Sequence, residues 1–219
     1  MRVVVDGREL DVEPGTTVLD ATRALGEAVP TLCFDDRQAP FGACRVCMVG
    51  VEGASGPVPA CTTPCRDGMV IDTADATARR VATAVVELVL SELPEPPAEH
   101  TELAAVARTL DVGELRWPGA VHPRSERDER HPYLAFQHDL CISCGRCVRA
   151  CDEVQGAFAL TATGRGFEAN VAAGLDAGFR DSTCVSCGAC ADTCPTDAIT
   201  EISLLSLAAV VPTQGGADA

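Results

Sequence analysis

The sequence predicts an α+β protein in which two thiol-rich regions flank a helical segment. Three observations lead to this prediction. The 13 cysteines of the 219-residue chain fall into two groups, within 33–65 and 141–194, and the 75 residues between the groups contain none. Short β-rich runs alternate with turn signals in the first 75 residues. The cysteine-free segment carries apolar residues at helical spacing.

The first region has the pattern of a small mixed unit of strands and one helix. Asp6-Gly7 is the commonest signal for a tight hairpin, so the runs on either side of it should pair. A helix capped by Thr16 or Thr17 should then run through Leu25, because its apolar residues recur at helical spacing. The expected strands cover residues 3–5, 9–12, 46–51 and 69–71.

The cysteine-free segment should contain two helices, over 76–93 and 100–112. In the first, Val81, Val85 and Leu88 lie on one face, and the proline-rich run that begins at Pro94 stops the helix. We therefore expect four parts, namely a thiol-rich domain (1–78), a helical linker (79–132), a second thiol-rich domain (133–205) and a flexible tail (206–219).

Composition excludes several classes of function. The 32 acidic residues outnumber the 17 basic ones, giving a formal net charge of −15, and nucleic acid is not an expected partner because phosphate binding needs a basic face. The N-terminal residues lack the runs of a signal peptide, and the longest apolar stretch, 202–211, is too short to span a bilayer. We expect a cytoplasmic protein without a membrane span. The number of cysteines is odd, so they cannot all be paired in disulfides, and many thiols in a cytoplasmic chain favour metal binding.

The second cysteine group contains two copies of one pattern. In each copy, three cysteines at intervals of three are followed by a fourth after three further residues, which is the spacing of bacterial ferredoxins with two [4Fe–4S] clusters. In those proteins the fourth cysteine of each copy binds the other cluster. We therefore assign one cluster to Cys141, Cys144, Cys147 and Cys194, and the other to Cys184, Cys187, Cys190 and Cys151.

The residues between and beside these cysteines favour iron–sulfur clusters over zinc and suggest how easily the clusters would be reduced. Gly145 and Gly188 occupy matching places in the two triplets, where a small residue lets the backbone approach a cluster. The alternative of two zinc sites, each on four cysteines, usually takes paired Cys-x2-Cys knuckles instead. Four acidic residues close to the triplets in sequence should disfavour cluster reduction, namely Asp139, Asp152, Glu153 and Asp192.

The first cysteine group resembles the plant-type arrangement for a [2Fe–2S] cluster, with one ligand loop and a distant fourth cysteine. Its four thiols stand on two loops, and the preceding hairpin and helix fit a β-grasp fold. Gly42 and Ala43 should keep the ligand loop tight, and a zinc site on the same four thiols is the alternative. Cys65 is left over and is expected to be a free thiol. The predicted ligands are Cys33, Cys44, Cys47 and Cys61.

The same segments resemble a known family. Phe41-Gly-Ala-Cys-Arg-Val-Cys-Met-Val49 with Pro59-Ala-Cys-Thr-Thr-Pro64 is similar to the N-terminal ferredoxin domain of the large iron–sulfur subunit of complex I. The run from Cys141 to Gly156, Gly164-Arg-Gly-Phe167 and the second triplet look most like the α-subunit of NAD-dependent formate dehydrogenase. The resemblance covers nearly the whole chain and implies one [2Fe–2S] and two [4Fe–4S] clusters on the twelve cysteines assigned above.

The chain departs from this family in two ways. The family usually has a further [4Fe–4S] cluster on one histidine and three cysteines, but the stretch 93–112 keeps only His100 and has no cysteine. That cluster should be absent, with His100 an ordinary surface residue. The molybdopterin-binding catalytic domain is also missing, so the resemblance implies a separate catalytic subunit.

The sequence therefore predicts an electron-transfer chain, without a catalytic site of its own. By the resemblance, it would relay electrons between a molybdopterin catalytic subunit and a flavin- or NAD-binding partner in a formate dehydrogenase-type complex. One alternative is the small diaphorase subunit of an NAD-reducing hydrogenase or a complex I-like module. Another is a free-standing soluble ferredoxin.

Overall fold

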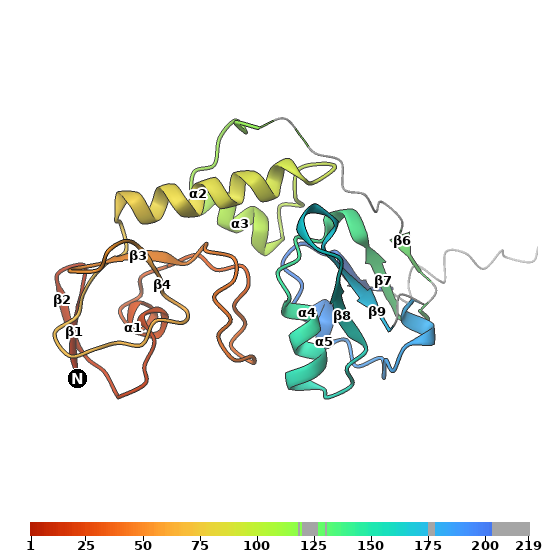
Figure 1. Ribbon diagram of the computed structural model, residues 1–219, viewed down its shortest axis with the longest axis horizontal. Coiled ribbons are helices and arrows are strands. Elements are labelled where there is room, and N and C mark those ends of the chain that lie inside the picture. Colours follow the sequence, from red (N-terminus) through yellow and green to blue (C-terminus); the bar gives the residue numbers. More distant parts are fainter. Residues whose placement is uncertain (118, 120–126, 130, 175–177, 203–219) are drawn as a thin grey trace, which may run out of the picture.

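The computed structural model describes residues 1–202 except 118, 120–126, 130 and 175–177. These residues form two thiol-rich domains, with a pair of helices lying across and between them (Figure 1). The expected tail (206–219) and His122 lie outside the described residues. No helix in the described part of the chain is long and apolar enough to cross a membrane.

The first domain is a mixed five-stranded sheet in the order β2-β1-β5-β3-β4 with one helix. Strands β1 and β5 pair in parallel, and the other neighbours are antiparallel. This arrangement agrees with the expected β-grasp fold. The elements are β1 (Arg2–Val5), β2 (Arg8–Asp11), α1 (Val18–Ala24), β3 (Met48–Val51), β4 (Val58–Pro59) and β5 (Val70–Asp72).

Local sequence explains these elements. Val3 and Val5 alternate with exposed or half-buried residues and are fully buried, which is the pattern of a strand with one covered face. Asp6 and Gly7 both have positive φ, as a tight hairpin requires. Thr17 caps α1 through a reciprocal capping box with Asp20. The four expected strands form within two residues of their expected bounds, whereas β4 was not expected.

Two helices form in the cysteine-free segment, α2 (Ala76–Ser91) and α3 (Glu102–Thr109). The second helix is shorter than the expected 100–112. Thr101 caps its N-terminus and Asp111 has a positive φ, which ends the helical path. The fully buried Val86 and Leu103 pack in an apolar cluster that also includes Leu32 of the first domain. The helices therefore join the first domain by apolar contacts.

The second domain combines short strands with single turns of helix. A three-stranded antiparallel sheet has the order β10-β7-β6, and β8 and β9 form a hairpin. Its apolar core includes Cys147, Cys151 and Cys190, and Cys141, Cys184 and Cys194 pack against it. The elements are β6 (Arg127–Asp128), β7 (Leu134–Gln137), α4 (Arg146–Arg149), β8 (Leu160–Thr163), β9 (Asn170–Ala173), α5 (Ala189–Asp192) and β10 (Ile199–Glu201).

Candidate metal centres

The N-terminal site gathers four thiols between the loop after α1 and the strands β3 and β4. Cys33 lies in that loop, Cys44 and Cys47 precede β3, and Cys61 follows β4. Three of the four are at most 2% exposed, and Cys44 is half-buried. The backbone N–H of Cys44 donates to the sulfur of Cys33 at 3.4 Å. The structure thus brings all four predicted residues together.

The thiols of this site form two hydrogen-bonded pairs. The Cys44 thiol donates to the Cys33 sulfur, which lowers the pKa of Cys33 to about 5. The Cys47 thiol donates to the Cys61 sulfur, which lowers the pKa of Cys61 to about 7. In each pair one sulfur thus favours the thiolate form, which is the form that binds metal.

Gly42 and Cys65, which lie beside the N-terminal site, agree with the expectations of a tight loop and a spare thiol. Gly42 has a positive φ, and a Cβ there would lie 2.9 Å from the side chain of Thr62, so the loop has no room for a larger residue. Cys65 is buried, and burial together with the Asp20 carboxylate raises the pKa of its thiol. A neutral, buried thiol is the form expected of a spare cysteine.

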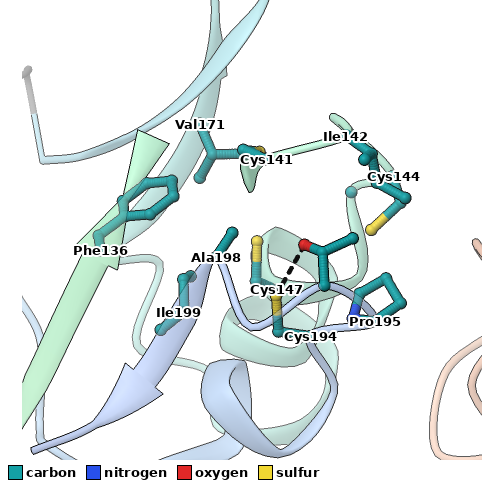
Figure 2. Close-up of a pocket in the computed structure, with 12 residues that line it drawn as sticks. Phe136, Cys141, Ile142, Cys144, Cys147, Val171, Cys194, Pro195, Ala198 and Ile199 are labelled. Carbon is teal, nitrogen blue, oxygen red and sulfur yellow. Dashed lines mark hydrogen bonds between the residues drawn. The ribbon is translucent and has the colours of Figure 1, made fainter. Parts of the chain in front are cut away.

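The first C-terminal site is a cavity onto which four sulfurs converge. Cys141, Cys144, Cys147 and Cys194 line it together with apolar side chains, as Figure 2 shows. It contains about 310 Å³ of empty space, part of it open to solvent. Cys194 follows the second triplet in sequence and yet joins the first triplet here, as the crossed spacing predicts.

The second C-terminal site is built in the same way. Cys184, Cys187 and Cys190 line a cavity of about 320 Å³ of empty space together with Cys151, which follows the first triplet. The backbone N–H of Ala159 donates to the Cys151 sulfur at 3.1 Å. Cys187 is exposed, so this cavity reaches the surface.

Matching backbone turns shape the two C-terminal sites. Ser143 and Ser186 have positive φ in the middle of the triplets, and Gly145 and Gly188 have a φ of 77° immediately before α4 and α5. Only glycine adopts that last conformation without strain. The turns direct backbone N–H groups toward the thiols, and the N–H of Ser186 donates to the Cys184 sulfur at 3.4 Å.

Burial disfavours the charged form of several C-terminal thiols. It raises the pKa of Cys144 and of Cys190 to about 12, and it also raises the pKa of Cys147 well above its usual value. Without a bound cation these thiols stay protonated, so metal binding has to release their protons.

None of the described histidines joins a thiol site. The side chain of His100 is 73% exposed and contacts Asp197 at 2.5 Å, as expected of a surface residue. His138 stacks on Phe136, at 4.0 Å between ring centroids. His131 is buried and contacts the hydroxyl of Ser186.

The acidic residues near the second group are not all free charges. Glu153 pairs with Arg149 at 2.8 Å and accepts the backbone N–H of Ala39 at 2.7 Å. Asp192 lies 3.8 Å from Arg37. Arginines therefore offset part of the negative charge to which we attribute a low reduction potential.

Sequence reasoning missed the polar contacts between the domains, of which those around Arg146 are the most buried. Arg146, between two cysteines of the first triplet, is 4% exposed and pairs with Glu102 of α3. Its guanidinium also contacts Thr193, which in turn donates to Asp35 of the first domain. The available signal was the difference between the Gly-Arg-Cys of the first triplet and the Gly-Ala-Cys of the second.

Two family descriptions match the chain. Residues 1–76 match the 2Fe-2S iron-sulfur cluster binding domain, and residues 140–198 match the 4Fe-4S dicluster domain. The first range contains the N-terminal thiol site, and the second contains both C-terminal sites.

Similar proteins are subunits of larger redox enzymes. The NADP-reducing hydrogenase subunit HndD of Solidesulfovibrio fructosivorans is 32% identical over 211 residues, which cover 92% of this chain and 36% of that protein. The mitochondrial NADH-ubiquinone oxidoreductase 78 kDa subunit of Candida albicans is 28% identical over 206 residues, which cover 91% of this chain and 28% of that protein. The chain thus spans well under half the length of these relatives.

A solved structure gives a match of similar length. A chain of an NAD+-reducing [NiFe]-hydrogenase in the H2-reduced state superposes with a TM-score of 0.84 at 26% identity, covering 93% of this chain and 88% of that chain. The order of the two matched domains and the relatives agree with the resemblance found in the sequence. The chain therefore belongs to the iron–sulfur family of the complex I and hydrogenase subunits, and it carries a [2Fe–2S] binding domain ahead of a [4Fe–4S] dicluster domain.

Proposed function

We propose that the twelve converging cysteines hold three iron–sulfur clusters. Cys33, Cys44, Cys47 and Cys61 would hold the [2Fe–2S] cluster, and the two C-terminal cavities would each hold a [4Fe–4S] cluster on their four sulfurs. In the described part of the chain, no group of three or more His, Cys, Asp or Glu side chains is arranged to hold a single metal ion. Thiols spread around a cavity suit a cluster of several irons better than a single zinc ion.

We infer that the chain is an electron-transfer subunit of an NAD(P)-linked oxidoreductase. Clusters of this kind accept and release single electrons. Two contacts join the N-terminal site to the first C-terminal site. Cys44 and Ile142 pack against one apolar cluster, and Gly145 faces Phe41 of the first domain. The first C-terminal site therefore lies nearer the N-terminal site than the second does.

A formate-oxidising assembly is the partner that the sequence motifs favour. The segments Cys151-Asp-Glu-Val-Gln-Gly156 and Gly164-Arg-Gly-Phe167 resemble the formate dehydrogenase α-subunit. In such an assembly this chain would connect a molybdopterin-type catalytic subunit with flavin- or NAD-binding subunits.

The second candidate is the small diaphorase subunit of an NAD-reducing hydrogenase. One observation favours it, namely the superposition on a hydrogenase chain that covers 93% of this chain and 88% of that one.

Reduction of the clusters by an added substrate distinguishes these two candidates. The chain is tagged in its native host, purified without oxygen together with its partners, and exposed to formate or to hydrogen. Bleaching of the visible cluster absorption by formate supports the first assignment, and bleaching by hydrogen alone supports the second. A cluster-loaded monomer that binds no other chain and responds to neither substrate overturns both and leaves a free-standing ferredoxin.

A further inference from the structure

The contact between the two domains is centred on Arg146. Its guanidinium makes a two-bond pair with the carboxylate of Glu102, at 2.6 and 3.0 Å. Its Nε donates to the hydroxyl of Thr193 at 2.9 Å, and Thr193 donates to the carboxylate of Asp35 at 2.6 Å. A paired guanidinium fork of this kind fixes both distance and orientation.

This network touches both neighbouring thiol sites through the chain itself. Arg146 stands between Cys144 and Cys147, and Thr193 directly precedes Cys194. On the other side, Arg146 donates to the carbonyl of Leu32, the residue before Cys33, at 3.4 Å.

Backbone contacts reinforce the same junction. Gln38 of the first domain is buried and donates through its side-chain amide to the carbonyl of Arg146 at 3.0 Å. The backbone N–H of Leu103 in α3 donates to the carbonyl of Pro195 at 3.0 Å. The first domain, α3 and the first C-terminal site are therefore held as one body.

The second C-terminal site has no equivalent of these side chains. The two triplets align residue by residue, and Ala189 stands where the first copy has Arg146. Ala150, which precedes Cys151, stands where Thr193 precedes Cys194. The two polar side chains thus flank the cysteines of only one site, the one that contacts the first domain, although cluster binding makes the same demands on both C-terminal sites.

We propose that Arg146 is a positioning residue that fixes the gap between the N-terminal site and the first C-terminal site. The inference rests on the proposed function, because only an electron relay depends on that gap. The step that it serves moves one electron, so the group at one site is oxidised as the group at the other is reduced, with no bond made or broken. Electron transfer between fixed centres slows steeply as the gap widens, and a looser junction widens it.

The test uses the full chain loaded with clusters. Arg146→Lys keeps the positive charge and removes the two-bond guanidinium pair, and Glu102→Gln weakens the same pair from α3, a helix that contains no cysteine. Arg165→Lys, at an exposed position in the turn between β8 and β9, is the matched control. After a pulse of photochemical reductant, the rate of electron equilibration between the [2Fe–2S] and [4Fe–4S] signals is followed, and their magnetic coupling is measured by paramagnetic resonance.

We expect both network variants to slow the equilibration several-fold and to weaken the magnetic coupling, while each cluster keeps its own spectrum and the control matches the wild type. Loss of thermal stability alone would not produce this result, because the rate is measured below the unfolding temperature. Wild-type rates and coupling in the loaded variants overturn the assignment of Arg146. If Arg146→Lys fails to bind iron, Glu102→Gln decides alone. A wild-type chain without clusters would instead refute the proposed function.

Discussion

Cys61 and Cys65 are both buried and only four residues apart, yet their surroundings differ. Cys61 shares a hydrogen bond with Cys47 within a group of four thiols, whereas burial and the Asp20 carboxylate raise the pKa of Cys65. Iron analysis of the wild-type chain should give about ten irons, from clusters of two, four and four. Cys61→Ser should lower the count to about eight and remove the [2Fe–2S] resonance signal, because one ligand is lost. Cys65→Ser should change neither, and loss of that signal in Cys65→Ser would contradict the assignment.

His131 is held as a neutral ring. The backbone N–H groups of Tyr133 and Leu134 donate to its Nδ1 at 3.1 and 3.0 Å, so the ring proton lies on Nε2, which donates to the Ser186 hydroxyl at 3.2 Å. Burial lowers the pKa of His131, although the nearby Asp128 acts in the opposite direction. The unfolded chain therefore binds a second ring proton more tightly than the folded chain does.

The sign of the resulting pH dependence follows from that difference. The free energy of unfolding should fall as the pH drops from about 6.5 toward the lowered pKa of His131, because protonation then favours the unfolded chain. Thermal unfolding of the loaded chain between about pH 5.5 and 7.5 measures it. His131→Gln should flatten the dependence in this range, and His100→Gln, at an exposed histidine, should retain it. An unchanged pH dependence in His131→Gln would contradict this account.

At the scale of elements, α2 and α3 stabilise the junction through apolar packing. Leu103 of α3 is fully buried among residues of both helices and the first domain, whereas Leu88 of α2 is 47% exposed. Leu103→Ala should cost about 2–5 kcal/mol through lost contacts and a cavity. Leu88→Ala should change stability by about 0.5 kcal/mol at most. Apparent unfolding temperatures at one scan rate compare the two, and equal shifts would refute this packing.

The elements also show what sequence reasoning reaches. Strong local signals, such as Asp6-Gly7 and the helical spacing of apolar residues after residue 76, predicted the first sheet and the long helix. The face that α2 buries carries Ala78, Ala82 and Val86, however, and not the expected Leu88. The spacing of the cysteines predicted which four thiols meet in each cavity. The short strands of the second domain were not predicted, because three-residue runs such as β10 gain their stability from pairing across the chain. The Arg146 network depends on contacts more than 40 residues apart in sequence, which no local pattern encodes.

At the scale of the whole molecule, the two domains depend on metal to different degrees. The core of the first domain is built mainly on strand and helix residues such as Val3, Leu19 and Ile71. The core of the second domain contains or borders the thiols of both its cavities. Removing the clusters should therefore loosen the second domain more than the first.

Hydrogen exchange with and without clusters tests this difference. Amides of residues 133–202 should lose most of their protection when the clusters are removed, and amides in β1, β3 and β5 should keep most of theirs. Equal loss in both domains would show that the first sheet also needs its metal. The control is protein whose clusters are chemically reduced but still bound, because it shows the effect of the reductant without cluster loss.

The crossed cysteines of the two C-terminal cavities set an order of events during biosynthesis. The N-terminal site has all its thiols once residue 61 has been made. The first triplet is complete at Cys147, but its cavity lacks a fourth sulfur until the ribosome has added Cys194. Neither C-terminal site can be finished on a nascent chain before almost the whole domain has emerged. The cysteines of both C-terminal sites are therefore complete only after those of the N-terminal site.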